Sequence, residues 1–98
     1  MVNILIKKTT VPKTSSRVSW EEFIGKTGIH PLRLSELVEM EWIEYDLTDQ
    51  DRYLFPEKEI FRVKRLLRIC KDFELPTLAG MIIVDLIERI EFLEKQIK

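Results

Sequence analysis

The feature that most constrains this chain is the apolar pattern of its C-terminal segment. Five apolar residues recur there at alternating spacings of three and four positions: Ile83, Leu86, Ile90, Leu93 and Ile97. This spacing predicts an α-helix that packs lengthwise against another helix, so the five residues form a candidate dimer or helix-packing seam. Charged residues interrupt the segment well before the ~20 apolar residues that a membrane span requires, and we expect no membrane association.

A sharp corner precedes this helix. Pro76 lacks the N–H that an inner helical turn needs, and it disfavours the α conformation for Leu75. We therefore predict that one helix ends near Asp72 and that the next begins at Pro76. The earlier helix is expected to start at Pro56 and to bury one stripe of side chains: Ile60, Val63, Leu67 and Cys70.

Length and composition favour one small domain. The chain has 98 residues, and an apolar content of 45% excludes wholesale disorder. A single cysteine rules out an internal disulfide, and together with a single histidine it cannot complete a zinc site. Met1–Lys8 has no signal-peptide character, so a reducing cytoplasm is the expected compartment.

The first half of the chain contains signals for two short helices. We interpret residues 1–18 as an N-terminal arm, with a candidate strand at Val2–Ile6 and a polar loop from Lys7 to Arg17, and residues 19–98 as a single domain. Ser19 and Glu22 fit a capping box, which predicts a helix from about Ser19 to Lys26. The turn that follows contains Gly28, and Pro31 opens a second helix that ends near Met40. Two short helices joined by such a turn form a helix-turn-helix.

A small hairpin is expected after the second helix. Trp42–Tyr45 is β-prone, residues 46–51 form a polar tip, and Arg52–Phe55 forms the predicted return strand. The predicted fold class is therefore mainly α: a winged helix-turn-helix of three helices plus a small β wing, followed by a long C-terminal helix.

Over about residues 19–97, this order of elements resembles the MerR-type winged-helix domain. Within that superfamily the chain is most similar to the CbpM-type chaperone modulators. The resemblance is carried by Tyr53-Leu54-Phe55, by the arginines and leucine of Arg62…Arg65-Leu66-x-Arg68, and by the segment Phe73–Met81 leading into Leu86–Leu93.

The resemblance implies a small cytoplasmic protein that binds the J-domain of a DnaJ-like co-chaperone of the CbpA type. By occupying that surface, it would restrain the co-chaperone from engaging its Hsp70 partner. The family is not enzymatic and needs no cofactor. No compact motif carries its contact residues over to this sequence.

DNA binding as a MerR-like transcriptional regulator is the alternative. A DNA-reading helix and its wing need cations to meet phosphates and base edges. From residue 36 to residue 51 this chain has seven acids and no Lys or Arg. We therefore expect DNA to be an unlikely ligand.

The same acids suit a cationic protein partner, and the resemblance implies one, since J-domains typically present a cationic helix. Our candidate protein-binding residues are Glu36, Glu39, Glu41, Trp42, Glu44 and Asp46, with Trp42 or Leu47 as an apolar anchor. The alternative is a solvated acidic face with Trp42 in the core. A homodimer through the C-terminal seam is compatible with either hypothesis.

Three other residues have structural interpretations. His30 precedes Pro31 without a Ser/Asp or Cys partner, so we expect it to cap the second helix or to lie on the surface, and we predict no catalytic or metal site. Cys70 is expected to be a small core side chain. Gly80 costs ~1 kcal/mol against Ala inside a helix, which predicts that another helix approaches it closely.

Overall fold

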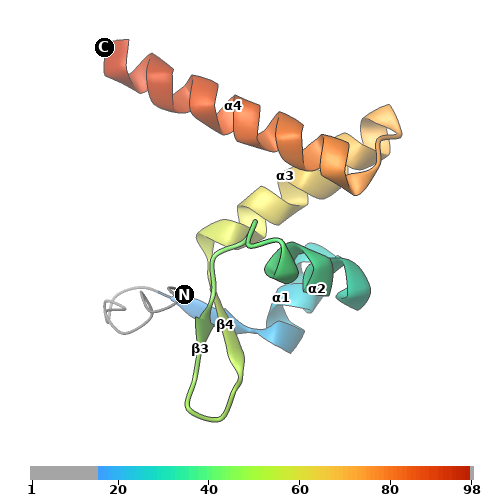
Figure 1. Ribbon diagram of the computed structural model, residues 1–98, viewed down its shortest axis with the longest axis vertical. Coiled ribbons are helices and arrows are strands. Elements are labelled where there is room, and N and C mark those ends of the chain that lie inside the picture. The colour runs from blue at the N-terminus through green and yellow to red at the C-terminus, as the bar shows by residue number, and fades with distance from the viewer. Residues whose placement is uncertain (1–15, 98) are drawn as a thin grey trace. The chain divides into compact units, whose positions relative to one another are not determined.

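The computed structural model describes residues 16–97, which contain four helices and a three-stranded antiparallel sheet (Figure 1). This confirms the mainly helical fold class, including the small β wing and the long C-terminal helix. The candidate strand at Val2–Ile6 lies outside the described residues. The chain divides into two compact units, residues 1–61 and residues 62–98, and each is described by itself.

The first unit begins with strand β2 (Arg17–Ser19) and helix α1 (Trp20–Thr27). The Ser19 hydroxyl accepts from the backbone N–H of Glu22 at 3.1 Å, and the Glu22 carboxylate accepts from the N–H of Ser19 at 3.2 Å. This confirms the capping box. Gly28 ends the helix in the left-handed region at φ 79°. Arg17, expected in the polar loop, instead belongs to β2 because it pairs with Pro56 in the sheet.

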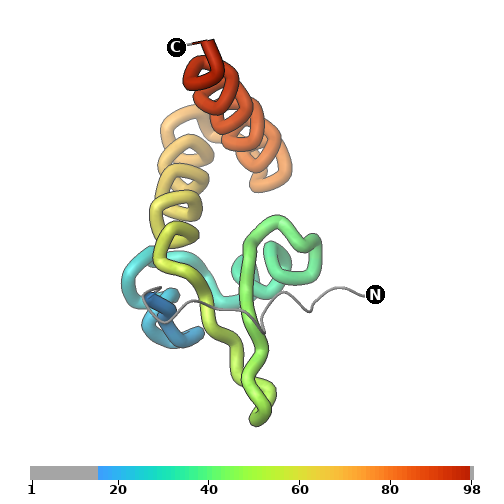
Figure 2. The backbone as a smooth tube through the Cα atoms, turned by 90° about the vertical axis from the view of Figure 1, so that its left-hand side faces the viewer, coloured from blue at the N-terminus to red at the C-terminus, as the bar shows by residue number. Residues whose placement is uncertain are grey.

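The wing is displaced along the sequence from its predicted position. Strand β4 (Tyr53–Pro56) lies between β2 and the short strand β3 (Asp46–Leu47), and both neighbours are antiparallel to it. Figure 2 shows the β3–β4 hairpin as a narrow extension. The predicted strand over Trp42–Tyr45 is therefore wrong. Its backbone donors are engaged elsewhere: the N–H of Trp42 donates to the carbonyl of Leu37, and the N–H of Glu44 to the carboxylate of Glu59.

The predicted start of the third helix at Pro56 is also wrong. Pro56 is the last residue of β4, opposite Arg17, and α3 (Lys58–Phe73) begins two residues later. A proline is tolerated at the end of a strand because no further ladder hydrogen bond needs its missing N–H.

The core of the first unit is apolar and aromatic. Phe23 of α1 packs against Phe55 of β4 with ring centroids 4.7 Å apart, and both are fully buried. The other buried apolar residues are Val18, Ile29, Leu34, Leu37, Val38, Ile43 and Ile60. This core joins the sheet to α1, and α2 (Pro31–Glu39) adds its own buried residues, Leu34, Leu37 and Val38.

The second unit contains α3 from Arg62 onward and α4 (Thr77–Ile97). Helix α3 ends at Phe73, the next residue Glu74 has a left-handed φ of 53°, and α4 begins one residue after Pro76. The carbonyl of Pro76 accepts the N–H of Gly80 at 3.1 Å, so Pro76 caps the helix and does not lie inside it. Helix α3 thus ends near Asp72, as predicted, whereas α4 begins one residue later than the predicted Pro76.

Small and branched residues allow α3 and α4 to approach closely. A Cβ at Gly80 would lie 2.9 Å from Cδ1 of Leu66 and closer still to Sγ of Cys70. This confirms the close approach predicted from Gly80, and Cys70 is buried as expected. Leu66, rather than the predicted Leu67, is the fully buried leucine of α3.

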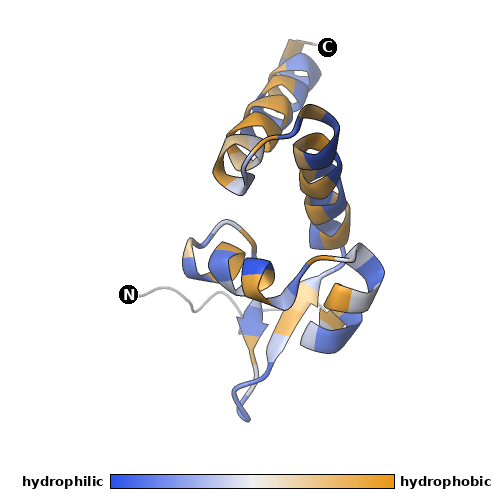
Figure 3. Ribbon diagram, turned by 90° about the vertical axis from the view of Figure 1, so that its right-hand side faces the viewer, coloured by the Kyte–Doolittle hydropathy of each residue, from blue (hydrophilic) through white to orange (hydrophobic). Residues whose placement is uncertain are grey.

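Ion pairs also connect the two helices. Arg62 contacts Glu88 at 2.6 Å and Asp85 at 3.2 Å, and Arg65 contacts Glu91 at 3.3 Å. The basic face of α3 is thus partly neutralised by acids of α4. Figure 3 shows that polar and apolar residues lie on different sides of α3, whereas apolar residues are frequent along α4.

Candidate functional site

Helix α2 is held so that one of its faces is exposed. His30 caps its N-terminus, since Nδ1 accepts the backbone N–H of Leu32 at 3.1 Å, and Pro31 occupies the first turn. This confirms the capping role expected of His30. Leu34, Leu37 and Val38 are buried, which leaves the opposite face to solvent.

The exposed face combines acids with apolar side chains. Glu36 and Glu39 lie four and seven residues after Leu32, so all three share one side of the helix. Leu32 is 70% exposed and Met40, at the C-terminal cap, is 49% exposed. Neither apolar residue was singled out from the sequence, although the spacing of Leu32 from the two glutamates was a usable signal.

The residue after Met40 extends this face. Glu41 adopts a left-handed φ of 57°, and its N–H donates to the carbonyl of Val38 at 3.0 Å. Trp42 donates to Leu37, and Ile43 is buried just beyond. The chain is therefore fixed on both sides of Glu41, whose side chain is exposed.

Three of the predicted carboxylates form no ion pair within the described chain. No ion pair joins Glu36, Glu39 or Glu41 to any residue in the range 16–97. We call these three residues the α2 acidic surface. Two of them lie in the last turns of α2, where the helix dipole disfavours negative charge, and that end of the helix has no basic residue.

The remaining candidates have structural partners. Asp46 forms an ion pair of 2.9 Å with Arg17, with side-chain exposures of only 13% and 17%. Glu44 pairs with Lys58 at 2.8 Å, and its N–H donates to Glu59, a buried carboxylate that no sequence pattern had indicated. These acids are already engaged within the fold, so they contribute less negative charge to a partner than the α2 acidic surface does.

The two candidate anchors differ in exposure. Trp42 is half-buried and Leu47 is exposed on β3. The exposure of Trp42 is therefore intermediate between that of a core residue and that of an exposed interface residue. Leu47 lies close in sequence to the exposed acids Asp49 and Asp51 of the wing tip.

The seam of α4 lies on the side of the helix opposite its buried residues. Gly80, Met81 and Val84 are buried. Four of the five seam residues are exposed, from 45% for Leu93 to 84% for Ile97, and Ile83 is half-buried. From Leu86 onward, the seam is therefore exposed within the part of the chain that the structure describes.

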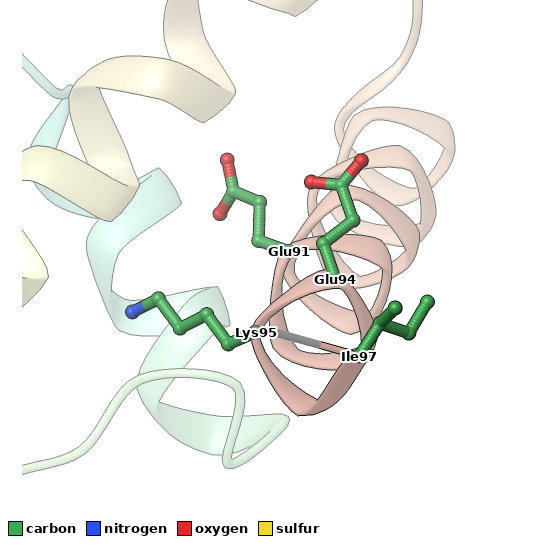
Figure 4. A pocket seen from close by; sticks show the side chains of 4 residues that line it. All are labelled: Glu91, Glu94, Lys95 and Ile97. Carbon is green, nitrogen blue, oxygen red and sulfur yellow. The ribbon is translucent and has the colours of Figure 1, made fainter.

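The hollow at the C-terminal end of α4 is open to solvent. The hollow in Figure 4 is lined by Glu91, Glu94, Lys95 and Ile97, all on one end of α4, so no second element encloses it. Residues 16–97 contain no group of three or more His, Cys, Asp or Glu side chains arranged to hold a metal ion. No helix in this range is long and apolar enough to cross a membrane.

The fold defines a class of protein: a helix-turn-helix, formed by α1 and α2, with a β wing. Residues 18–98 match the family described as MerR HTH family regulatory protein, and the chain belongs to this family. A search of curated proteins found no significant match.

Proposed function

We propose that this chain regulates a DnaJ-like co-chaperone of the CbpA type by binding its J-domain and limiting its engagement with Hsp70. The α2 acidic surface is the observation on which the proposal depends. It supports a cationic protein ligand, and the sequence resemblance to CbpM-type modulators supports the J-domain as that ligand.

The charge of α2 weighs against DNA as the ligand. In a helix-turn-helix, the second helix enters the major groove, where most of the affinity comes from cations that neutralise phosphates. Here that helix carries Glu36 and Glu39 against one cation, Arg33, and Glu41 lies two residues beyond its end. Each carboxylate would repel phosphate at short range.

The placement of the acids also favours a binding role. Negative charge at the C-terminal end of a helix costs about 0.3–1 kcal/mol. Within the described chain no ion pair offsets this cost for Glu36 or Glu39. Residues that destabilise their own helix are more readily explained by recognition than by folding. Leu32 and Met40 supply apolar contact area beside them, as the centre of a protein interface requires.

The test is a titration of a CbpA-type J-domain into the full chain by calorimetry. We expect the triple variant Glu36→Lys, Glu39→Lys, Glu41→Lys to bind at least tenfold more weakly than the unaltered chain. A matched control changes the net charge equally at exposed acids elsewhere: Glu21→Lys, Glu57→Lys and Asp72→Lys. The control should bind nearly normally, and equal losses in both variants would refute the acidic surface.

The same titration in rising salt adds a second readout. Complementary charges lose attraction as the Debye length falls from ≈ 10 Å at 0.1 M to 3 Å at 1 M salt. The affinity of the unaltered chain for the J-domain should therefore fall with salt, and the affinity of the triple variant should change less.

A DNA-binding transcriptional regulator is the second candidate, because the chain belongs to a helix-turn-helix regulatory family. It predicts tight, salt-sensitive retention on a duplex oligonucleotide and no affinity for a J-domain. It also predicts that the triple lysine variant binds duplex more tightly than the unaltered chain does. The two candidate functions are therefore distinguished by whether the chain binds a J-domain or duplex DNA.

A further inference from the structure

Helix α3 carries two sets of cations, and only one of them is paired within the described chain. Arg62 and Arg65 form ion pairs with Glu88 and Glu91 of α4, and these two carboxylates lie three residues apart on one side of their helix. One side of α3 therefore already binds regularly spaced acids of a second helix.

The second set lies on a different side of α3. Lys64, Arg68 and Lys71 are spaced by four and three residues, so they share one face of the helix. All three are exposed, and none forms an ion pair within residues 16–97. Because Lys64 and Arg68 are like charges one turn apart, they destabilise their own helix. Folding alone does not explain this arrangement.

An aromatic side chain lies among these cations. Phe61 precedes Lys64 by three residues and Arg68 by seven on the same helix, and its side chain is 72% exposed. An exposed aromatic residue with charged residues around it has the composition of a protein interface, in which the apolar side chain is the anchor and the charges form the rim. We call Phe61, Lys64, Arg68 and Lys71 the α3 basic face.

Charge and spacing favour an acidic helix over a nucleic acid as the ligand of this face. Nucleic-acid affinity comes mostly from cations that neutralise many phosphates, and a chain of net charge −1 has no long-range attraction for a polyanion. The three cations extend over only roughly 10 Å of the helix, from the rise of 1.5 Å per residue. Carboxylates at spacings of three and four residues on a helix match this length and this pattern.

We propose that the α3 basic face binds an amphipathic helix of another protein, one that carries carboxylates at spacings of three and four residues and an apolar residue beside them. The carboxylates pair with Lys64, Arg68 and Lys71, and the apolar residue covers Phe61. The contact repeats, on an open side of α3, the pairing that Arg62 and Arg65 make with α4. The proposal does not depend on the identity of the ligand at α2.

The experiment is a fluorescence anisotropy titration of the full chain into a labelled synthetic helical peptide. The peptide carries Glu at positions i, i+4 and i+7 with a leucine beside them, and a scrambled peptide of the same composition is the control. The patterned peptide should bind at least tenfold more tightly than the scrambled one. Phe61→Ser should weaken its binding about fivefold, because the variant lacks the apolar anchor.

Charge reversal of the chain locates the contact. The double variant Lys64→Glu, Arg68→Glu should bind the patterned peptide at least tenfold more weakly. The matched control Lys26→Glu, Arg52→Glu changes the net charge equally at exposed cations elsewhere and should bind nearly normally. Circular dichroism checks that both variants keep their helix content.

A charge-swapped peptide, with Lys in place of each Glu, provides the complementary test. It should bind the Lys64→Glu, Arg68→Glu variant at least fivefold more tightly than it binds either the unaltered chain or the matched control. Equal binding of patterned and scrambled peptides, or equal losses in the two double variants, overturns the proposal. Tighter binding of a single-stranded or duplex oligonucleotide through Lys64 and Arg68 also overturns it, in favour of a nucleic acid. Self-association of the unaltered chain that is lost in the Lys64→Glu, Arg68→Glu variant overturns it in favour of a second copy.

Discussion

Gly80 of α4 lies so close to Cys70 of α3 that a Cβ at position 80 would overlap the Cys70 sulfur. Gly80→Ala should therefore destabilise the protein, although Ala is the better helix former by ~1 kcal/mol. Overpacking a close contact costs about 1–3 kcal/mol, and this contact also includes Leu66, so we expect a net loss of about 1 kcal/mol. Urea unfolding of the variant measures it.

The double variant Gly80→Ala, Cys70→Ala identifies the cause. Removing the sulfur opens the space that the new methyl group needs, so the cost of Gly80→Ala should shrink in the Cys70→Ala background. An unchanged cost would mean that Leu66, and not the sulfur, limits the approach.

The ion pair between Arg17 and Asp46 predicts a stability effect without a binding effect. It joins the two outer strands of the sheet and is mostly buried. Asp46→Asn leaves the guanidinium without its counter-charge, and we expect a loss of about 1–3 kcal/mol in the free energy of unfolding. Asp49→Asn at the exposed tip should change it by less than about 0.5 kcal/mol. The affinity of the folded Asp46→Asn protein for the J-domain should stay the same. A large loss of affinity would show that Asp46 belongs to the binding surface.

At Leu32 we expect the opposite: a substitution that weakens binding without lowering stability. Because its side chain is 70% exposed, Leu32→Gln should leave the thermal midpoint nearly unchanged. If the side chain anchors the partner beside Glu36 and Glu39, J-domain binding should weaken by about 1–2 kcal/mol, roughly fivefold to thirtyfold. Leu47→Gln is the comparison, since Leu47 was one of the two anchors expected from the sequence, with Trp42. A larger effect at Leu47 would move the contact from α2 to the wing.

The cap of α2 can be improved. His30 accepts the N–H of Leu32 through its ring nitrogen, whereas aspartate is among the preferred capping residues and adds negative charge at the favourable end of the helix dipole. His30→Asp should raise the free energy of unfolding by about 0.3–1 kcal/mol. His30→Ala, which removes the acceptor, should lower it by about 0.5–2 kcal/mol.

The first two helices were predictable because their ends are encoded locally. Ser19 with Glu22, Gly28 and Pro31 each act within one turn, and the structure confirms all of these signals. The wing was misplaced because its backbone donors depend on distant partners. The N–H of Glu44 reaches Glu59, fifteen residues away, and no local pattern reveals such a bond.

The acidic character of the candidate site was likewise visible in the sequence, but the state of each acid was not. From their positions in the sequence alone, Asp46 and Glu36 are equally available to a cationic partner. The structure separates them, because Arg17 neutralises Asp46 from another strand, whereas Glu36 has no ion pair within the described residues. Which charges remain for a partner is therefore a property of tertiary pairing.

Ser19 is at once the last residue of β2 and the residue that caps α1. Any shortened form of this chain that starts after Ser19 would lose an outer strand of the sheet and the start of its first helix in a single cut. For the same reason, if one residue were inserted between Val18 and Ser19, Ser19 could keep either its pairing with β4 or its position as the cap of α1, but not both. Tags and fusion partners should therefore be joined upstream of Ser16.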